Sequence, residues 1–483
     1  HPASDTCYHF GYFNFCKANG DDIDIPTIVG AIQGAFEKKQ NEDKFERLQK
    51  LKDFLGTSYI ILVGFFGGLM SFSRSPFFLS CLFLFFNANA RSGKTEYWGA
   101  SRPKLVLVIV IDQFRADYLS RYQGKFTTEN GFKELMKTGA YFPYGEYDIL
   151  QSMTGPGHAT IMTGAYPYQM GIPVNSWYDQ KTRSKMYCAE GTPKNLIGTT
   201  VGDELKNADI PSKNISIALK DRASIFLGGH RADLALWFDE SSKQWASSNH
   251  YIKNGKLPFW AEKLNATEIL AKCNLEEPCG IELTTQAAIS AIEGENLGQG
   301  SGTDILTVGY SSHDYAGHKY GPNSNEIREM TVAEDKSIAQ LLKAVDKKVK
   351  GRIKNALIVL TGDHGVGPKA EYLKAHGIES ESISEKELVD EIESLLNKNY
   401  GKPKEGKWIK FVFDFNFYLD EQAISDSKVD ISTVEKDIKS VLVKNKGFAY
   451  VVTQQEYQNR QLPPEMFARQ ILKTYYPGRS GHV

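Results

Sequence analysis

Short apolar runs and longer amphipathic segments alternate along the chain after residue 103. The clearest run, Lys104-LVLVIVI-Asp112, holds seven consecutive Val, Ile or Leu residues between two charged ones. Such a run predicts a strand that is buried on both faces, as in a parallel sheet. Similar apolar runs are expected as strands over 215–219, 232–238, 304–310 and 355–362.

Between these runs, apolar residues recur with the period of an amphipathic helix. The period is clearest over 326–349, where Ile338, Leu341, Leu342 and Val345 fall on one face. Shorter helices are expected over 132–139, 201–208 and 284–293. Strands that alternate with helices predict an α/β fold with a doubly wound, mostly parallel central sheet and helices on both faces.

Acidic and histidine side chains follow three of the predicted strands. Asp112 ends the first, Asp314 and His318 follow the strand over 304–310, and Asp363 and His364 follow the last. Each of these residues alone has an ordinary explanation, such as a helix N-cap. However, parallel strands place their carboxyl ends at one edge of the sheet, and this edge is where such sheets bind ligands. Oxygen and imidazole ligands together suit Zn²⁺ or another divalent transition metal better than Ca²⁺ or Mg²⁺.

The stretch 151–175 begins with turn-forming residues around Thr154, and a run with helical character follows. Gly155 and Gly157 allow a sharp turn, and Pro156 sets the φ angle of a first helical turn. Thr154 is therefore expected at the N-terminal end of a short helix, where backbone N–H groups and the helix dipole favour an anion such as phosphate. A metal would help its hydroxyl to ionise, and two metals could clamp an in-line phosphoryl displacement. The alternative is an N-cap threonine in an ordinary loop.

Lys220 and Arg222 form a basic pair at the end of the strand predicted over 215–219. Two residues apart on a strand, they are expected to point to the same face. A guanidinium fork and an ammonium together suit the extra charge of a phosphate monoester dianion. A basic pair on the surface is the alternative.

These motifs, in this order, resemble the alkaline phosphatase superfamily and, within it, the PafA-type alkaline phosphatases, which are zinc phosphomonoesterases with a threonine nucleophile. The resemblance runs from residue 104 to the C-terminus and rests on VIDQFRADYL, TGPGHATIMTGAYPYQMGI with Asn175, LKDRAS, SSHDYAGHKYGPNS and LTGDHG. It implies hydrolysis of small phosphate monoesters through a phospho-threonine intermediate at a two-zinc site. A phosphodiesterase or nucleotide pyrophosphatase of the same superfamily is the alternative. The Lys-x-Arg pair makes this alternative less favoured.

The resemblance also assigns roles to individual residues. Thr154 would be the nucleophile that becomes phosphorylated. The zinc that activates it would be held by Asp112, Thr154, Asp363 and His364. The zinc that stabilises the leaving oxygen, and then activates water, would be held by Asp314 and His318. The phosphoryl oxygens would be contacted by Asn175, Lys220 and Arg222.

In the family, the second zinc takes a third ligand from a histidine in a C-terminal Gly-Thr-Thr-His-Gly region. Here the chain ends in Arg-Ser-Gly-His482-Val483, which resembles the Arg-Ser-Gly-Asp segment that precedes that region in the family. We therefore expect a domain truncated at its C-terminus, whose second metal site lacks one ligand, with His482 as a weak candidate for it. An inactive fragment is a further alternative.

The N-terminal part of the chain carries a targeting pattern. From Met70 to Ala90, a short basic region is followed by an apolar core and an Asn-Ala-Asn-Ala end, which is typical of a secretory signal peptide. We expect 1–69 to be an uncertain upstream segment, 70–90 a signal peptide and 91–483 the catalytic domain, with insertions at about 223–300 and 370–460. A further apolar run just upstream leaves a membrane anchor through 59–86 as the alternative to a released periplasmic or extracellular protein.

Charge and cysteine content refine this prediction. The formal net charge is -1, and no basic stripe indicates a nucleic acid partner. Cys273 and Cys279 are close enough in sequence to form a disulfide, which an exported protein permits. Cys188 is then left without an obvious partner, and three unpaired thiols are the alternative. The oligomeric state stays open.

Overall fold

The computed structural model describes residues 7–10, 13–16 and 102–483, apart from 128, 209–210, 253, 268, 381 and 463–465. Near the N-terminus, β1 (Cys7–Phe10) and β2 (Phe13–Cys16) form a two-stranded sheet. The rest of the expected upstream segment 1–69, the expected signal peptide 70–90 and the possible anchor 59–86 lie outside the described residues. Among the helices that are described, none has the length and apolar character needed to cross a membrane.

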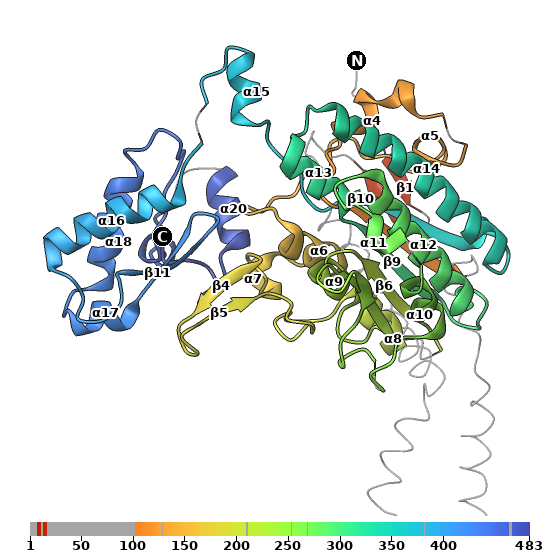
Figure 1. Ribbon diagram of the computed structural model, residues 1–483, viewed down its shortest axis with the longest axis horizontal. Helices are drawn as coiled ribbons and strands as arrows, with labels where there is room; N and C mark the ends of the chain where they lie inside the picture. Colours follow the sequence, from red (N-terminus) through yellow and green to blue (C-terminus); the bar gives the residue numbers. More distant parts are fainter. Residues whose placement is uncertain are drawn as a thin grey trace, which may run out of the picture. The chain divides into compact units, whose positions relative to one another are not determined.

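A six-stranded sheet organises the chain from residue 105 onward, with the order β10-β3-β9-β6-β7-β8. Figure 1 labels its strands β10, β9 and β6. The strands of the sheet are β3 (Leu105–Ile111), β6 (Asn214–Ala218), β7 (Leu234–Asp239), β8 (Gln244–Ala246), β9 (Asp304–Tyr310) and β10 (Ala356–Gly362). All neighbouring pairs are parallel except β7 and β8, which are antiparallel. The predicted α/β fold with a mostly parallel central sheet is confirmed.

Helices connect and cover these strands. Those up to β9 are α4 (Asp117–Arg121), α5 (Phe132–Thr138), α6 (Thr154–Thr163), α7 (Pro167–Met170), α8 (Val201–Ala208), α9 (Asp221–Gly228), α10 (Phe259–Asn265), α11 (Ile269–Lys272) and α12 (Pro278–Gly294). Two follow β9, namely α13 (Ser312–Tyr320) and α14 (Asn325–Lys348). A hairpin of β4 (Ser176–Asp179) and β5 (Ser184–Tyr187) lies between α7 and α8 in the sequence. Short 3-10 turns cover Gln123–Lys125 and Ile353–Asn355.

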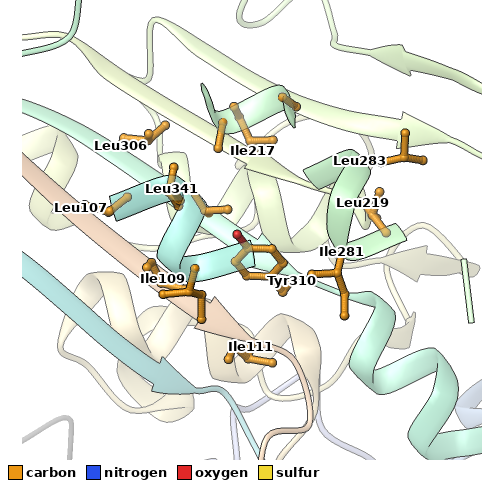
Figure 2. Close-up of a cluster of buried hydrophobic side chains, with 14 of the residues drawn as sticks. Leu107, Ile109, Ile111, Ile217, Leu219, Ile281, Leu283, Leu306, Tyr310 and Leu341 are labelled. Atoms are coloured by element: carbon orange, nitrogen blue, oxygen red, sulfur yellow. The ribbon is translucent and has the colours of Figure 1, made fainter. Parts of the chain in front are cut away.

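Strand β3 is buried on both faces, as its uninterrupted apolar run predicts. Leu107 and Ile109 point into a cluster that also contains residues of α12 and α14, part of which Figure 2 shows. Val108 and Val110 point to the opposite face, into a cluster with residues of α6 and α9. Because side chains alternate along a strand, only a run of apolar residues can fill both faces. The sheet is therefore covered by helices on both sides.

The segment 223–300, expected as an insertion, is largely part of the main fold. It contributes β7 and β8 to the central sheet, and α12 packs within the same hydrophobic cluster as β3 and β9. The prediction of an insertion there was therefore wrong for most of the segment. The strand predicted over 232–238 is present as β7. Strand β8 was missed because it has only three residues and polar turns surround it.

The segment 370–460 forms its own hydrophobic cluster, built around Leu396, Trp408 and Ile438. Its elements are α15 (Ala370–Ala375), α16 (Glu385–Tyr400), β11 (Ile409–Phe413), β12 (Asn416–Leu419), α17 (Glu421–Asp426), α18 (Ile431–Leu442) and α19 (Gln454–Gln458). Within this segment, β11 and β12 pair as an antiparallel hairpin. Helix α20 (Met466–Thr474) follows.

Of the two alternatives for the cysteines, the structure has the disulfide rather than three unpaired thiols in the described part of the chain. Cys273 and Cys279 form a disulfide across the short loop before α12. Cys188 is buried and unpaired within the described residues. The pairing across a six-residue separation is confirmed.

Candidate active site

The carboxyl ends of three neighbouring strands lie level with one another in the central sheet. Gly362 of β10 pairs with Ile111 of β3, and Ile111 in turn pairs with Tyr310 of β9. Asp363 and Asp112, which follow directly, therefore leave the sheet at the same edge. Helix α13 begins at this edge too, two residues after the end of β9.

Acidic and histidine side chains at this edge converge into two buried groups. One comprises Asp112, Asp314 and His364, and the other comprises Asp112, Asp363 and His158. In each group, one ligand atom from every residue lies within 4.8 Å of the others. Oxygen and imidazole donors of this kind suit a divalent transition metal. Since the two groups share Asp112, the arrangement is consistent with a bimetallic site.

Asp363 and His364 carry buried donor atoms that suit a metal. Oδ2 of Asp363 and Nε2 of His364 lie 3.7 Å apart. Oδ2 also lies 2.9 Å from Nδ1 of His158, and Nε2 lies 3.2 Å from Oδ1 of Asp112. The other ring nitrogen of His364, Nδ1, lies 2.9 Å from the carbonyl oxygen of Gly365 and can donate to it. This bond would leave Nε2 as the acceptor in the neutral ring, which is the form that binds metals. The residues present therefore fit a metal ion.

The charges of this pair stabilise each other in the metal-free protein. Burial alone would raise the pKa of Asp363, but His364 and His158 lower the pKa to about 2. Burial alone would lower the pKa of His364, but Asp363 and Asp112 raise the pKa to about 10. Without metal, His364 is therefore an imidazolium at neutral pH.

Lys220 lies at the centre of the site. Its Nζ donates to Oδ2 of Asp112 over 2.7 Å and to Oγ1 of Thr154 over 3.2 Å, and it also donates to Asp314. The Lys220 side chain is buried and its ammonium lies 5.2 Å from the ring centroid of Tyr315. One cation therefore contacts two buried carboxylates and the threonine hydroxyl.

The ammonium changes the ionisation of both carboxylates. Burial and Asp363 raise the pKa of Asp112, but Lys220 and His364 more than offset this and hold the pKa below its ordinary value. The pKa of Asp314 is also lowered, because His318 and Lys220 outweigh burial and the repulsion from Asp112. Both carboxylates are therefore ionised at neutral pH.

Thr154 begins α6, as the sequence predicts. Its Oγ1 lies 3.3 Å from Oδ2 of Asp112, and the residue is buried. A close approach of α6 to the strand end explains one glycine of the motif, because a Cβ atom on Gly157 would lie 2.6 Å from the carbonyl oxygen of Asp363. Only glycine allows the backbone of α6 to pack this tightly against the end of β10.

Asn175 is tied to the first turn of the same helix. Its Oδ1 accepts a hydrogen bond from the backbone N–H of Gly155 over 2.7 Å. A Cβ atom on Gly155 would lie 2.7 Å from this oxygen, so a larger residue here would displace the Asn175 side chain. The side chain of Asn175 and the start of α6 therefore form one structural unit.

The basic pair is arranged differently from the prediction. Strand β6 ends at Ala218, Lys220 is the N-cap residue of α9, and Arg222 lies in the first turn of that helix. The prediction that the pair lies on a strand was therefore wrong. Tyr187 and, to a smaller extent, Asp112 raise the pKa of Arg222 and outweigh its burial. Leu219 extends the apolar run beyond the end of the strand, so the run does not show where the strand stops.

His318 lies at the open side of the site. Its Nε2 is 3.2 Å from Oδ1 of Asp314, and the His318 side chain is 71% exposed. The two residues are one helical turn apart on α13, which brings their side chains to the same face. They can therefore bind one ion together.

Two residues at the site were missed by the sequence analysis. His158 is completely buried, and its Nδ1 lies 2.9 Å from the carbonyl oxygen of Thr154 and 2.9 Å from Oδ2 of Asp363. Its position one helical turn after Thr154 on α6 is the sequence signal that could have identified it.

Gln113 is the second of these residues. It donates from its backbone N–H to Asp363 over 2.9 Å and from Nε2 to Asp314 over 2.7 Å.

Gln113 adopts a φ of 64°, in the left-handed region that residues other than glycine rarely occupy. Such conformations cluster at functional sites, where surrounding contacts hold them in place. No sequence signal marks this residue, because glutamine has no preference for this conformation.

His482, the weak candidate for a further metal ligand, is engaged elsewhere. Its Nδ1 accepts from the backbone N–H of Leu419 over 3.2 Å, and its Nε2 lies 3.1 Å from Oε1 of Glu421. Neither of the two groups found among the described residues includes it. The structure therefore does not support His482 as a ligand.

Comparisons with known proteins agree with this geometry. The family described as type I phosphodiesterase / nucleotide pyrophosphatase matches residues 106–469. The chain is 30% identical over 451 residues to alkaline phosphatase PafA of Elizabethkingia meningoseptica, covering 79% of this chain and 81% of that protein. It is 29% identical over 450 residues to alkaline phosphatase PhoV of Synechococcus elongatus, covering 79% and 80%.

A solved structure shows the same fold. The crystal structure of wild-type PafA matches with a TM-score of 0.74 at 29% identity, covering 79% of this chain and 84% of that one. The match includes the region that carries the central sheet and the strand-end site. The chain therefore belongs to the type I phosphodiesterase / nucleotide pyrophosphatase family of phosphoesterases, within the alkaline phosphatase superfamily.

Proposed function

We propose that this protein is an exported phosphate monoester hydrolase that works through a phospho-threonine intermediate at a two-zinc site. The observation that carries the proposal is the position of the Thr154 hydroxyl. It lies at the start of α6, within 3.3 Å of Asp112 and 3.2 Å of the Lys220 ammonium. The names of the relatives PafA and PhoV as alkaline phosphatases support the same reaction.

The residues fall into two proposed metal-binding sets. One zinc ion would be held by Asp112, Thr154, Asp363 and His364, and the other by Asp314 and His318. The buried groups divide these residues differently, because Asp314 lies with Asp112 and His364. In a chain without metal, Lys220 forms ion pairs with both Asp112 and Asp314, which explains why these two carboxylates lie close together. Zinc ions bound here would polarise the phosphoryl oxygens and lower the pKa of a coordinated hydroxyl.

The chain's own residues would then carry the transfer. Oγ1 of Thr154 attacks phosphorus, the bond from phosphorus to the ester oxygen breaks, and the alcohol leaves. Water then attacks the phospho-threonine, which releases inorganic phosphate and restores the Thr154 hydroxyl. Lys220 stabilises negative charge on the threonine oxygen, and Asn175 and Arg222 bind the phosphoryl oxygens.

Phosphodiester or nucleotide pyrophosphate hydrolysis is the second candidate, because the matching family is described by these activities. A monoester dianion carries one more negative charge than a diester. The buried Lys220 and the mostly buried Arg222 would supply two cations to the phosphoryl group. Two cations in contact with the phosphoryl group would support a preference for monoesters.

The first test compares an aryl phosphate monoester with the matching diester, each with added zinc and after chelation. We expect zinc-dependent phosphate release from the monoester and a kcat/KM for it at least about tenfold above that for the diester. Faster diester turnover would favour the second candidate. A folded protein that turns over neither ester would contradict both.

Zinc binding itself should depend on pH. In the metal-free protein the pKa of His364 is raised to about 10, so at neutral pH a proton must leave before the ring can bind metal. We expect the apparent zinc affinity at this site to rise by about tenfold for each pH unit between pH 6.5 and 8.5. Competition with a zinc-binding dye measures this dependence. His364→Gln should weaken binding and flatten the dependence, whereas a pH-independent wild-type affinity would contradict the raised pKa.

A further inference from the structure

Arg222 needs a partner that fixes its guanidinium. It lies in the first turn of α9 and is largely shielded from solvent. Its NH1 donates to the hydroxyl oxygen of Tyr187 over 3.2 Å, whereas its Nε is buried with no partner in the described part of the chain. An arginine that binds phosphate through a planar fork works only if the fork is held in the correct orientation.

Tyr187 connects this guanidinium to a fixed carboxylate. Its hydroxyl donates to Oδ1 of Asp221 over 2.6 Å while it accepts from Arg222. The same Oδ1 accepts the backbone N–H of Arg222 over 2.7 Å. Burial raises the pKa of the Tyr187 hydroxyl above its ordinary value, so the hydroxyl stays neutral and serves as donor and acceptor at once.

The β4–β5 hairpin connects Tyr187 to the other proposed phosphoryl contact. Tyr187 is the last residue of β5 and pairs with Ser176, the first residue of β4. The next residue, Cys188, donates its backbone N–H to the carbonyl oxygen of Asn175 over 3.0 Å. The end of the hairpin therefore holds the backbone of Asn175 on one side and the guanidinium of Arg222 on the other.

We propose that Tyr187 is a positioning residue that orients Arg222 relative to Asn175 and so strengthens binding of the phosphate dianion over singly charged diesters. The inference rests on the proposed function, because it assumes that Arg222 contacts the phosphoryl group. Tyr187 acts through Arg222 and has no separate contact with the substrate.

The test is Tyr187→Phe in the zinc-loaded, full-length protein. Inorganic phosphate binding, measured by calorimetry, is expected to weaken by about tenfold, the loss associated with one hydrogen bond to a charged group. The kcat/KM for an aryl phosphate monoester should fall by a similar factor, and that for the matching diester by less than about threefold. The decrease should appear mainly in KM if Arg222 binds ground and transition states alike.

Two further variants separate positioning from a general loss of structure. In an Arg222→Ala background, Tyr187→Phe should have no further effect on phosphate affinity, since the partner through which it acts is absent. The matched control is Tyr251→Phe, because Tyr251 is buried and its hydroxyl donates over 3.0 Å to the carbonyl oxygen of Gly229, at the other end of α9. Tyr251→Phe should leave phosphate affinity unchanged.

Unchanged phosphate affinity in Tyr187→Phe would overturn the proposal. The proposal would also fail if Tyr187→Phe weakened phosphate binding in the Arg222→Ala background as much as it does in wild type. A wild-type protein that binds no phosphate would overturn both this proposal and the proposed function. If wild type binds phosphate but prefers diesters, the proposed function fails alone. The coupling of Tyr187 to Arg222 is then decided by the binding measurements.

Discussion

Thr154→Ala is expected to reduce phosphate release from an aryl phosphate monoester by on the order of 10³-fold or more, because no other group could take the place of the nucleophile. Nearby hydroxyls do not replace it. Among the described residues, Thr154 is the hydroxyl residue that contacts both Asp112 and Lys220. The substitution removes a buried hydroxyl and a methyl group, so the free energy of unfolding should fall by only about 1–2 kcal/mol.

The measurement combines steady-state turnover with acid-quench labelling by a radioactive phosphate ester. Wild type should retain label on Thr154, and Thr154→Ala should retain none. Thr160→Val is the matched control, because Thr160 lies on the same helix, is completely buried, and its hydroxyl has no hydrogen-bond partner in the described chain. Phosphate release that survives Thr154→Ala unchanged would exclude a phospho-threonine mechanism.

Much of the site could be predicted because it follows from strand ends. The apolar run before Asp112 identifies a strand buried on both faces, and similar runs precede Asp314 and Asp363. Parallel pairing then requires these strand ends to lie together, as the register of β10, β3 and β9 shows. The glycines around Thr154 likewise predicted a helix start, which the structure has at that residue.

Other features depend on contacts between distant segments that no local pattern encodes. The position of Lys220 between Asp112 and Asp314 depends on where β6 ends and α9 begins. The sequence hides this boundary, because Leu219 extends the apolar run past the end of β6. Tyr187 reaches Asp221 across a sequence separation of 34 residues. Strand β7 was predicted over 232–238, but β8 was missed because it has only three residues at the edge of the sheet.

Asp112→Asn is the second substitution with a large expected effect, because Asp112 belongs to both buried groups of candidate ligands. An amide keeps the shape of the side chain but lacks the negative charge that a divalent cation needs. We expect zinc affinity to fall by at least about 100-fold, and monoester turnover to fall with it. Metal content after equilibrium dialysis, measured by atomic emission, gives a readout that is independent of activity.

The Tm of Asp112→Asn, measured with and without zinc, distinguishes a loss of metal binding from a loss of folding. Without metal, Asp112→Asn loses the ion pair with Lys220 but also relieves repulsion from Asp363, so the two effects oppose each other. Zinc at 100 times its Kd should stabilise wild type by about 2.7 kcal/mol, and this zinc-induced rise in Tm should disappear in the variant.

Asp304→Asn is the control for this experiment. Asp304 is a buried carboxylate that begins β9, at the opposite edge of the same sheet, and it accepts the backbone N–H groups of Lys213 and Gly298. Its loss should lower Tm but leave the zinc content and the zinc-induced rise in Tm intact. If Asp112→Asn instead keeps full zinc content, the strand-end carboxylates do not form the metal site, and the two-zinc proposal fails even if the protein hydrolyses phosphate esters.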